Sequence, residues 1–216
     1  MTDHAIRAAI EAGLMDIEPL TESCVEPASY DLRVGNEAFV SGANEKTAVD
    51  TRGWVVIEAG EFAVVNTRER VRCGPQVAGL LGLSSTYARK GLTLLSGPQI
   101  DPGFDGKLVV RMTNLSPNRV TLAYEAPFLT AQFFKLSRPV EHPYAGLRQG
   151  QTGLRPEDLD DLTTSDNMTL GGVVKSLASL ASDVSELKTS VRWMARALPA
   201  IVAFGIAAIT GIAALK

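Results

Sequence analysis

The sequence predicts an all-β head followed by a helical C-terminal region. Between residues 27 and 136, short apolar or alternating runs are separated by Gly, Pro, Asn and Asp, a spacing typical of an all-β sandwich or barrel. From residue 170 onward, apolar residues recur at alternating steps of three and four, as in a coiled-coil helix. We therefore expect a head domain over residues 1–156, a linker over 157–167, a coiled-coil stalk over 168–196 and a transmembrane helix over 197–215.

Short elements make up the predicted head. Residues 3–14 predict a short amphipathic helix, because the apolar side chains between Ile6 and Leu14 fall on one face. The stretch 138–167, rich in Gly, Pro, Asp and Gln, predicts a strap or linker with little regular structure. We expect strands over residues 30–34, 54–57, 62–66, 77–83, 92–95, 107–114, 119–123 and 128–136.

Composition and charge argue against several classes of function. The chain of 216 residues has a formal net charge of −3, so no overall basic field points to duplex DNA or RNA as a partner. Cys24 and Cys73 lie far apart, and neither histidine, His4 or His142, stands near them at metal-ligand spacing. We therefore expect no zinc site. The N-terminus lacks an apolar segment long enough for a signal peptide, which predicts a cytoplasmic head.

The C-terminal apolar pattern predicts self-association. A heptad seam is formed by Leu170, Val173, Leu177, Leu180, Val184, Leu187, Val191, Met194 and Leu198. Strict alternation through four repeats favours a coiled coil over a helix packed on its own domain. Leu and Val are not segregated by core position, so two strands and three strands both remain open.

An uncharged segment follows the seam. Residues 197–215 contain no charged side chain and, at about 1.5 Å per residue, come close to the roughly 30 Å thickness of a bilayer core. Lys188, Arg192 and Arg196 precede the segment, and Trp193 stands where an interfacial aromatic belongs. The positive-inside tendency therefore predicts a single-pass C-terminal membrane anchor with the head in the cytoplasm.

Three short motifs stand in order along the head. They are Pro-Ala-Ser-Tyr-Asp-Leu-Arg-Val-Gly at 27–35, Ser-Ser-Thr-Tyr-Ala-Arg-Lys-Gly at 84–91, and Ile-Asp-Pro-Gly-Phe-Asp-Gly at 100–106, which leads into a strand ending at Asn114. In this order and at this spacing they resemble the motifs of the dCTP deaminase and trimeric dUTPase family. The N-terminal helix is more similar to the deaminase branch, and the resemblance covers roughly residues 3–155.

The resemblance implies a distorted β-barrel, or β-clip, of the dUTPase type that assembles as a homotrimer with active sites at subunit interfaces. A three-fold head and a three-stranded coil can share one symmetry axis, so the two expectations support each other. The implied ligand is a pyrimidine deoxynucleoside triphosphate, bound together with Mg²⁺. The residues implied at the nucleotide are Ser84, Ser85, Thr86, Ala88, Arg89, Asp101, Phe104, Val109, Val110, Tyr144 and Gln151.

Phosphate contacts are expected from the second motif. A Ser-Ser-Thr turn that ends in Arg89 offers hydroxyls, backbone N–H groups and a guanidinium to phosphate oxygens. Ser84 stands where the family's motif has its first arginine, and Lys90 is a candidate to compensate for it. The family's C-terminal lysine has no plain counterpart, and Arg148 is the nearest substitute.

Asp101 and Arg111 bear on the reaction. The resemblance implies that Asp101 is the water-orienting carboxylate, and the deaminase branch carries a glutamate ten residues after it, where this chain has Arg111. Deamination of cytosine at C4 needs a proton shuttle, which a carboxylate can provide and a guanidinium cannot. The sequence therefore favours pyrophosphate release from dUTP over deamination of dCTP, unless another acid such as Glu125 or Asp105 reaches the base.

Three functions stay open at this point. The chain is an enzyme acting on dUTP or dCTP, or a catalytically degenerate trimer that senses nucleotides or serves as a scaffold at a membrane. A third reading is a structural membrane oligomer whose head is only a rigid body, because fold alone does not fix function. Turnover supports the first, binding without turnover supports the second, and indifference to changes at Arg89 and Asp101 supports the third.

Overall fold

The computed structural model describes residues 1–159 except 42 and 44, and, farther along, residues 173, 176, 177, 179–195 and 197. The chain divides into two units, Met1–Gly171 and Gly172–Lys216. The expected transmembrane helix over 197–215 lies outside the described residues, apart from Ala197, as does most of the expected linker. The helices of the described residues include none with the length and hydropathy needed to span a bilayer.

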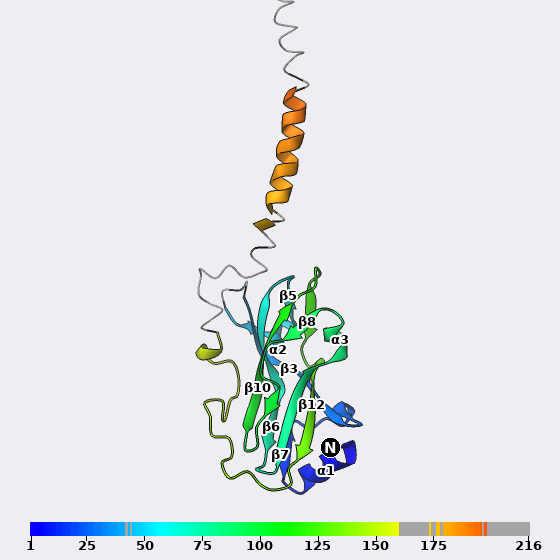
Figure 1. The fold of residues 1–216 in the computed structure, drawn as a ribbon, viewed down its shortest axis with the longest axis vertical. Helices are drawn as coiled ribbons and strands as arrows, with labels where there is room; N and C mark the ends of the chain where they lie inside the picture. The colour runs from blue at the N-terminus through cyan, green and yellow to red at the C-terminus, as the bar shows by residue number, and fades with distance from the viewer. Residues whose placement is uncertain are drawn as a thin grey trace, which may run out of the picture. The chain divides into compact units, whose positions relative to one another are not determined.

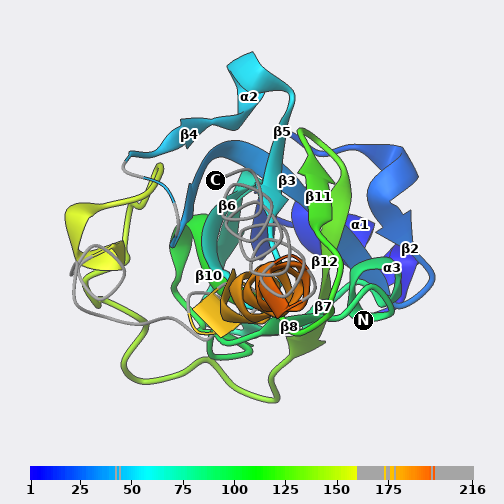
Figure 2. The same cartoon turned by 90° about the horizontal axis from the view of Figure 1, so that it is seen from above.

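The first unit is the all-β head that the sequence predicts (Figures 1 and 2). A ten-stranded sheet has the order β8-β10-β6-β3-β12-β7-β9, with β1 on β6 and β2 and β4 on β3, and β11 pairs with β5 in a separate two-stranded sheet. All these pairings are antiparallel. The strands are β1 Met15–Glu18, β2 Val25–Glu26, β3 Ser29–Val40, β4 Thr47–Ala48, β5 Trp54–Ile57, β6 Phe62–Cys73, β7 Val77–Leu83, β8 Leu92–Leu94, β9 Gln99–Ile100, β10 Asp105–Asn114, β11 Val120–Ala123 and β12 Pro127–Lys135.

Helices in the head are short. They are α1 Asp3–Glu11, η1 Glu22–Cys24, α2 Val49–Arg52, α3 Ser85–Ala88 and η2 Pro156–Asp158. Thr2 caps α1 by accepting a hydrogen bond from the Ala5 backbone N–H at 3.3 Å, and Ile6 is buried against the sheet. The helix ends before residue 14, where the sequence prediction placed its end, because Gly13 adopts a left-handed conformation (φ +67°) and Met15 begins β1.

Alternating burial on the long strands fixes which side chains reach the surface. On β10, Leu108, Val110 and Met112 are buried in the core, while the residues between them are only partly buried. Since successive side chains on a strand point to opposite faces, Lys107 and Arg111 lie on the face of β10 away from the core. Residues of both sets line the cavity described below.

The first motif has a structural role in the head. The Arg33 backbone N–H and Nε donate to the two carboxylate oxygens of Glu69 at 2.8 and 2.6 Å, and the Glu69 side chain is fully buried. Glu125, in the turn between β11 and β12, pairs with Arg68 at 2.9 Å. Arg33 and Glu125 therefore connect strands and turns of the head through ion pairs.

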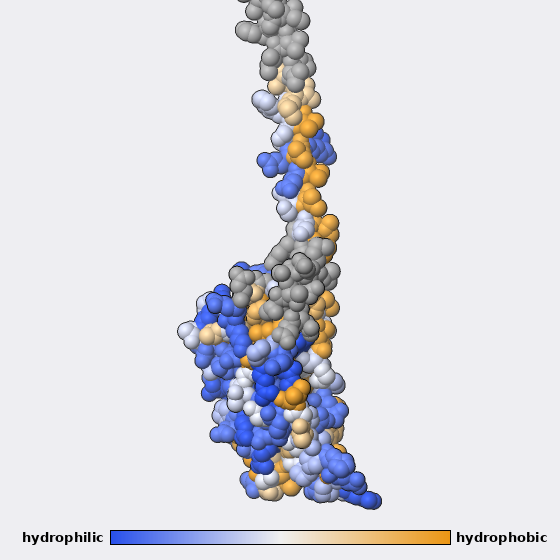
Figure 3. All heavy atoms as spheres, turned by 90° about the vertical axis from the view of Figure 1, so that its left-hand side faces the viewer, coloured by the Kyte–Doolittle hydropathy of each residue, from blue (hydrophilic) through white to orange (hydrophobic). Residues whose placement is uncertain are grey.

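In the second unit, the longest continuous stretch that the structure describes is residues 179–195, and these residues are helical. The seam side chains are exposed, with relative accessibilities of 60% for Leu177, 58% for Leu180 and 64% for Leu187. Figure 3 shows the apolar side chains following this helix as one stripe, with polar side chains beside it. The one-sided pattern is thus present on a helix, as the sequence predicts, while Leu170 and Leu198 lie outside the described residues.

Candidate functional site

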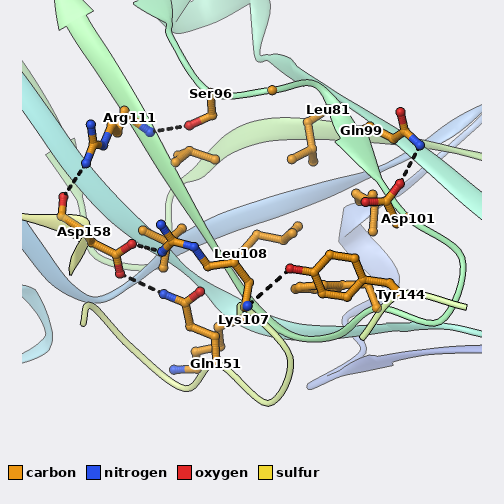
Figure 4. Close-up of a pocket in the computed structure, with 16 residues that line it drawn as sticks. Leu81, Ser96, Gln99, Asp101, Lys107, Leu108, Arg111, Tyr144, Gln151 and Asp158 are labelled. Atoms are coloured by element: carbon orange, nitrogen blue, oxygen red, sulfur yellow. Dashed lines mark hydrogen bonds and ion pairs between the residues drawn. The ribbon is translucent and has the colours of Figure 1, made fainter. Parts of the chain in front are cut away.

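A cavity of about 310 Å³ lies beside β10 and is lined by residues from both faces of that strand. Residues 143–159, which we call the strap, form its second wall and run alongside β10 as an irregular segment ending in η2 (Figure 1). The turn after β9, which carries Asp101, forms one end of the cavity. Figure 4 shows side chains from all three segments around this cavity.

Backbone hydrogen bonds hold the strap against β10. The Lys107 N–H donates to the Gln151 carbonyl at 2.7 Å, and the Gly150 N–H donates to the Asp105 carbonyl at 2.8 Å. Gly106 permits this approach, because a Cβ at that position would lie 2.9 Å from the Gln151 nitrogen. The third motif therefore carries a glycine where the strap docks.

The third motif also forms the end of the cavity that carries Asp101. The Gln99 amide donates to the Asp101 carboxylate at 2.5 Å. Gly103 turns the chain with φ +92°, and the Tyr144 N–H donates to the Pro102 carbonyl at 2.7 Å. This brings the Tyr144 ring edge-on to Phe104, with ring centroids 5.8 Å apart.

Arg111 lies at the opposite end of the cavity from Asp101 (Figure 4). Its backbone N–H donates to the Ser96 hydroxyl at 2.6 Å, and its Nη2 donates to the backbone carbonyl of Asp158 at 2.9 Å. The guanidinium at the position of the deaminase glutamate thus joins β10 to the end of the strap.

Asp158 is the centre of a polar cluster that the sequence did not predict. Its side chain is 2% exposed and forms an ion pair with Arg148. The carboxylate also accepts hydrogen bonds from the Gln151 amide at 2.9 Å and the Arg155 N–H at 2.8 Å. The packed head therefore continues past residue 156, where the sequence placed the start of a linker. A proline at the first position of η2 with acidic residues after it is the local signal for this turn.

Lys107 is a second lining residue that was not predicted. Its Nζ donates to the Asn36 Oδ1 at 3.0 Å, and burial lowers the pKa of its amine from the usual value, opposed by the nearby Glu37 carboxylate. By contrast, Glu125 and Asp105 do not line the cavity, and Asp105 pairs with Arg70 at 2.5 Å. Within one copy, neither of these two acids therefore lies at the cavity that holds Arg111.

The predicted site residues fall into two groups. The cavity brings together Asp101, Phe104, Val109, Val110, Arg111, Tyr144 and Gln151. Ser84, Ser85, Thr86 and Ala88 do not line it, and Arg89 lines a separate cavity beyond α3. The Ser84 hydroxyl is buried with no hydrogen-bond partner among the described residues. Within one chain the second and third motifs therefore do not form one pocket.

The described residues hold no cluster of three or more His, Cys, Asp and Glu side chains suited to a metal ion. Cys24 and Cys73 are both buried free thiols. Among the described residues, the carboxylates that line the cavity are Asp101 and Asp158. Asp158 is already paired with Arg148 and hydrogen-bonded to Gln151.

Comparison with known proteins assigns the family. The family described as dCTP deaminase-like matches residues 1–128. A dCTP deaminase of Thermococcus sibiricus is 41% identical over 155 residues, which cover 72% of this chain and 94% of that protein. The chain belongs to the dCTP deaminase family. This confirms the family predicted from the three motifs.

Other members of the dCTP deaminase family show how far the similarity extends. A dCTP deaminase, dUMP-forming, of Bifidobacterium longum is 33% identical over 177 residues, covering 72% of this chain and 92% of that protein. The crystal structure of the dCTP deaminase of Agrobacterium tumefaciens superposes with a TM-score of 0.53 at 18% identity, over 62% of this chain and 47% of that one. The similarity to this crystal structure shows the shared fold, with a short N-terminal helix before a curled antiparallel sheet.

Proposed function

We propose that this member of the dCTP deaminase family binds dCTP in the cavity between β10 and the strap. The reaction would replace the 4-amino group by water oxygen, so that dCTP and water give dUTP and ammonia. The observation that carries the proposal is the gathering of seven predicted residues, from the third motif, β10 and the strap, around one cavity. Relatives named dCTP deaminase match along most of their length.

Each wall offers a different contact to this ligand. Phe104 and Tyr144 give the apolar surface on which a deoxyribose or base packs. Asp101, held by Gln99, orients the attacking water and is the carboxylate placed to exchange a proton with it. The phosphate-binding second motif would come from another copy of the chain, since it does not line this cavity within one copy.

The triphosphate would bring Mg²⁺ with it. Asp158 is taken up by Arg148 and Gln151, and Asp101 stands at the other end of the cavity (Figure 4). These carboxylates do not make a protein cage for the ion, and Mg²⁺ commonly keeps several waters and binds through substrate phosphates. Its contribution would be to neutralise phosphate charge.

The test is an assay of products with the full-length protein. We expect incubation with dCTP and Mg²⁺ to release ammonia and form dUTP, measured by an ammonia-coupled assay and by nucleotide chromatography. A parallel incubation with dUTP and Mg²⁺ is analysed by the same chromatography, in which dUMP and pyrophosphate report hydrolysis of dUTP. Absence of all products from both nucleotides would rule out the enzymatic function.

A nucleotide-sensing or scaffolding trimer is the second candidate, and Arg111 is the observation that favours it. A guanidinium stays protonated and cannot pass a proton between water and the base. The sensing function predicts that dCTP or dUTP raises the melting temperature of the protein while no product appears.

Arg111→Glu separates the two candidates. If Arg111 serves to anchor the strap, the new carboxylate faces the Asp158 carbonyl without a donor, and KM for dCTP rises about tenfold with no gain in kcat. Arg111→Lys is the matched control, because an ammonium can still donate to that carbonyl. A clear gain of ammonia release in Arg111→Glu would instead identify the natural chain as the degenerate form.

Assembly and localisation belong to the same proposal. We propose a homotrimer formed through the head and the coiled-coil seam, anchored in a membrane by residues 197–215 with the head in the cytoplasm. The exposed seam on a helix and the uncharged final segment support this arrangement. Light scattering of the full-length protein in detergent should give the mass of three copies, and the protein should sediment with membranes. A monomer would contradict the proposed trimer, and a protein that stays in the supernatant would contradict the proposed membrane anchor.

A further inference from the structure

A second cavity, of about 570 Å³, opens where the turn after α3 meets the turn between β10 and β11. Three cationic side chains line it, Arg89, Lys90 and Arg119, and no carboxylate does so among the described residues. The sequence pointed to the first two, through the second motif. Arg119 comes from a different turn and was not predicted at a site.

The charge of this cavity is not balanced within the head. Of the three cations, Lys90 lies with its Nζ 5.0 Å from the centre of the Tyr87 ring. Arg89 and Arg119 make no side-chain hydrogen bond or ion pair with any described residue. Two uncompensated guanidinium groups at one cavity form an attractive site for an anion with several negative charges.

The two turns are fixed against each other. Gly91 has φ +92°, and a Cβ there would lie 2.6 Å from the Cβ of Ser116. The Leu115 N–H donates to the Gly91 carbonyl at 2.9 Å. Only a glycine permits this approach, which sets the turn bearing Arg119 directly beside the end of the second motif.

The turn that carries Arg119 is also ordered from within. Asn114 is fully buried, and its amide donates to the carbonyls of Ile57 and Asn118 at 2.9 and 2.8 Å. Its side-chain oxygen accepts from the Ser116 N–H and hydroxyl at 3.0 and 2.8 Å. The backbone next to Arg119 is therefore held in place before any ligand arrives, which lowers the cost of binding.

We propose that Arg119 acts with Arg89 as a second guanidinium for the terminal phosphates of the nucleoside triphosphate. This inference rests on the proposed function for the identity of the ligand. Guanidinium groups bind phosphate oxygens through paired N–H donors, and two of them from separate turns grip a chain of phosphates at two points. Arg119 would thus distinguish a triphosphate from a monophosphate, and it supplies a guanidinium from outside the second motif, in which Ser84 stands at the first arginine position.

Calorimetric binding with the full-length protein tests this role. Arg119→Ala should weaken dCTP binding about tenfold or more and leave dCMP binding unchanged, while Arg119→Lys should recover part of the loss. Arg138→Ala, which removes an exposed cation away from both cavities, should bind dCTP as the natural chain does. Unchanged dCTP binding in Arg119→Ala, or an equal loss for dCMP, would overturn the inference.

Inorganic tripolyphosphate separates this inference from the proposed function. If tripolyphosphate binds in an Arg119-dependent manner and no pyrimidine nucleotide binds, the phosphate site stands and the proposed function fails. If tripolyphosphate binding does not depend on Arg119, the inference fails whatever the turnover of dCTP. Arg119 could instead pair with carboxylates of a second copy of the chain. Light scattering of Arg119→Ala tests this alternative, because it measures the mass of the oligomer. Loss of the oligomer with intact phosphate binding would assign Arg119 to a subunit contact and overturn the inference.

Discussion

Replacing Asp101 by asparagine is expected to lower kcat with dCTP by about 10³-fold, the usual scale for a positioned general acid or base. The substitution keeps the shape of the side chain and an oxygen that can accept from Gln99, so binding of the nucleotide should change little. The loss should therefore appear in kcat, measured as ammonia release under saturating dCTP.

Asp105→Asn is the matched control for this experiment. Asp105 follows four residues later as the first residue of β10, pairs with Arg70 at 2.5 Å and does not line the cavity. Its substitution should leave kcat close to the natural value. Equal losses in both variants would mean that the structure of this segment, and not the Asp101 carboxylate, limits the reaction. A fully active Asp101→Asn would show that Asp101 takes no part in the chemistry.

Much of the head and part of the site could be predicted because their signals are local. The alternation of apolar residues on β10 is a period-two pattern, and the third motif places Asp101 and Phe104 at the end of a strand that the pattern already marks. The expected strand over residues 77–83 coincides with β7, and that over 54–57 coincides with β5. Strand ends were less accurate, since β6 continues to Cys73 through charged residues that resemble a loop.

The missed residues depend on contacts between distant segments. Asp158 belongs to an acidic stretch that resembles a solvated linker, and only its pairing with Arg148 across the strap shows that it is buried. Lys107 and Arg119 look like ordinary surface cations until the strap covers the first and Gly91 draws the second toward Arg89. Sequence spacing carries no information about such approaches, because the intervening chain can take many paths.

Replacing Asp158 by alanine is expected to raise KM for dCTP by about ten- to a hundredfold. The substitution removes a charged acceptor, and a hydrogen bond to a charged group contributes about 1.5–3 kcal/mol, which corresponds to a factor of roughly 10 to 10². Arg148, whose side chain is 43% exposed, also loses its ion-pair partner. The Gln151 amide and the Arg155 N–H lose an acceptor at the same time. The strap should detach from β10 and open the cavity, and the rise in KM would be measured by steady-state ammonia release.

Glu157→Ala separates this effect from a general loss of acidic charge. Glu157 is the neighbouring residue in η2, but it is exposed and does not line the cavity, so its substitution should leave KM unchanged. Limited trypsin digestion gives an independent readout, because a detached strap exposes the bond between Arg148 and Gln149. Rapid cleavage there in Asp158→Ala, with the rest of the head resistant, is the result that local opening predicts. An unaltered KM together with an uncut strap would show that the Asp158 side chain does not hold the strap, and the wall of the cavity would then depend on the other contacts of the strap, among them the backbone bonds of Gly150 and Gln151.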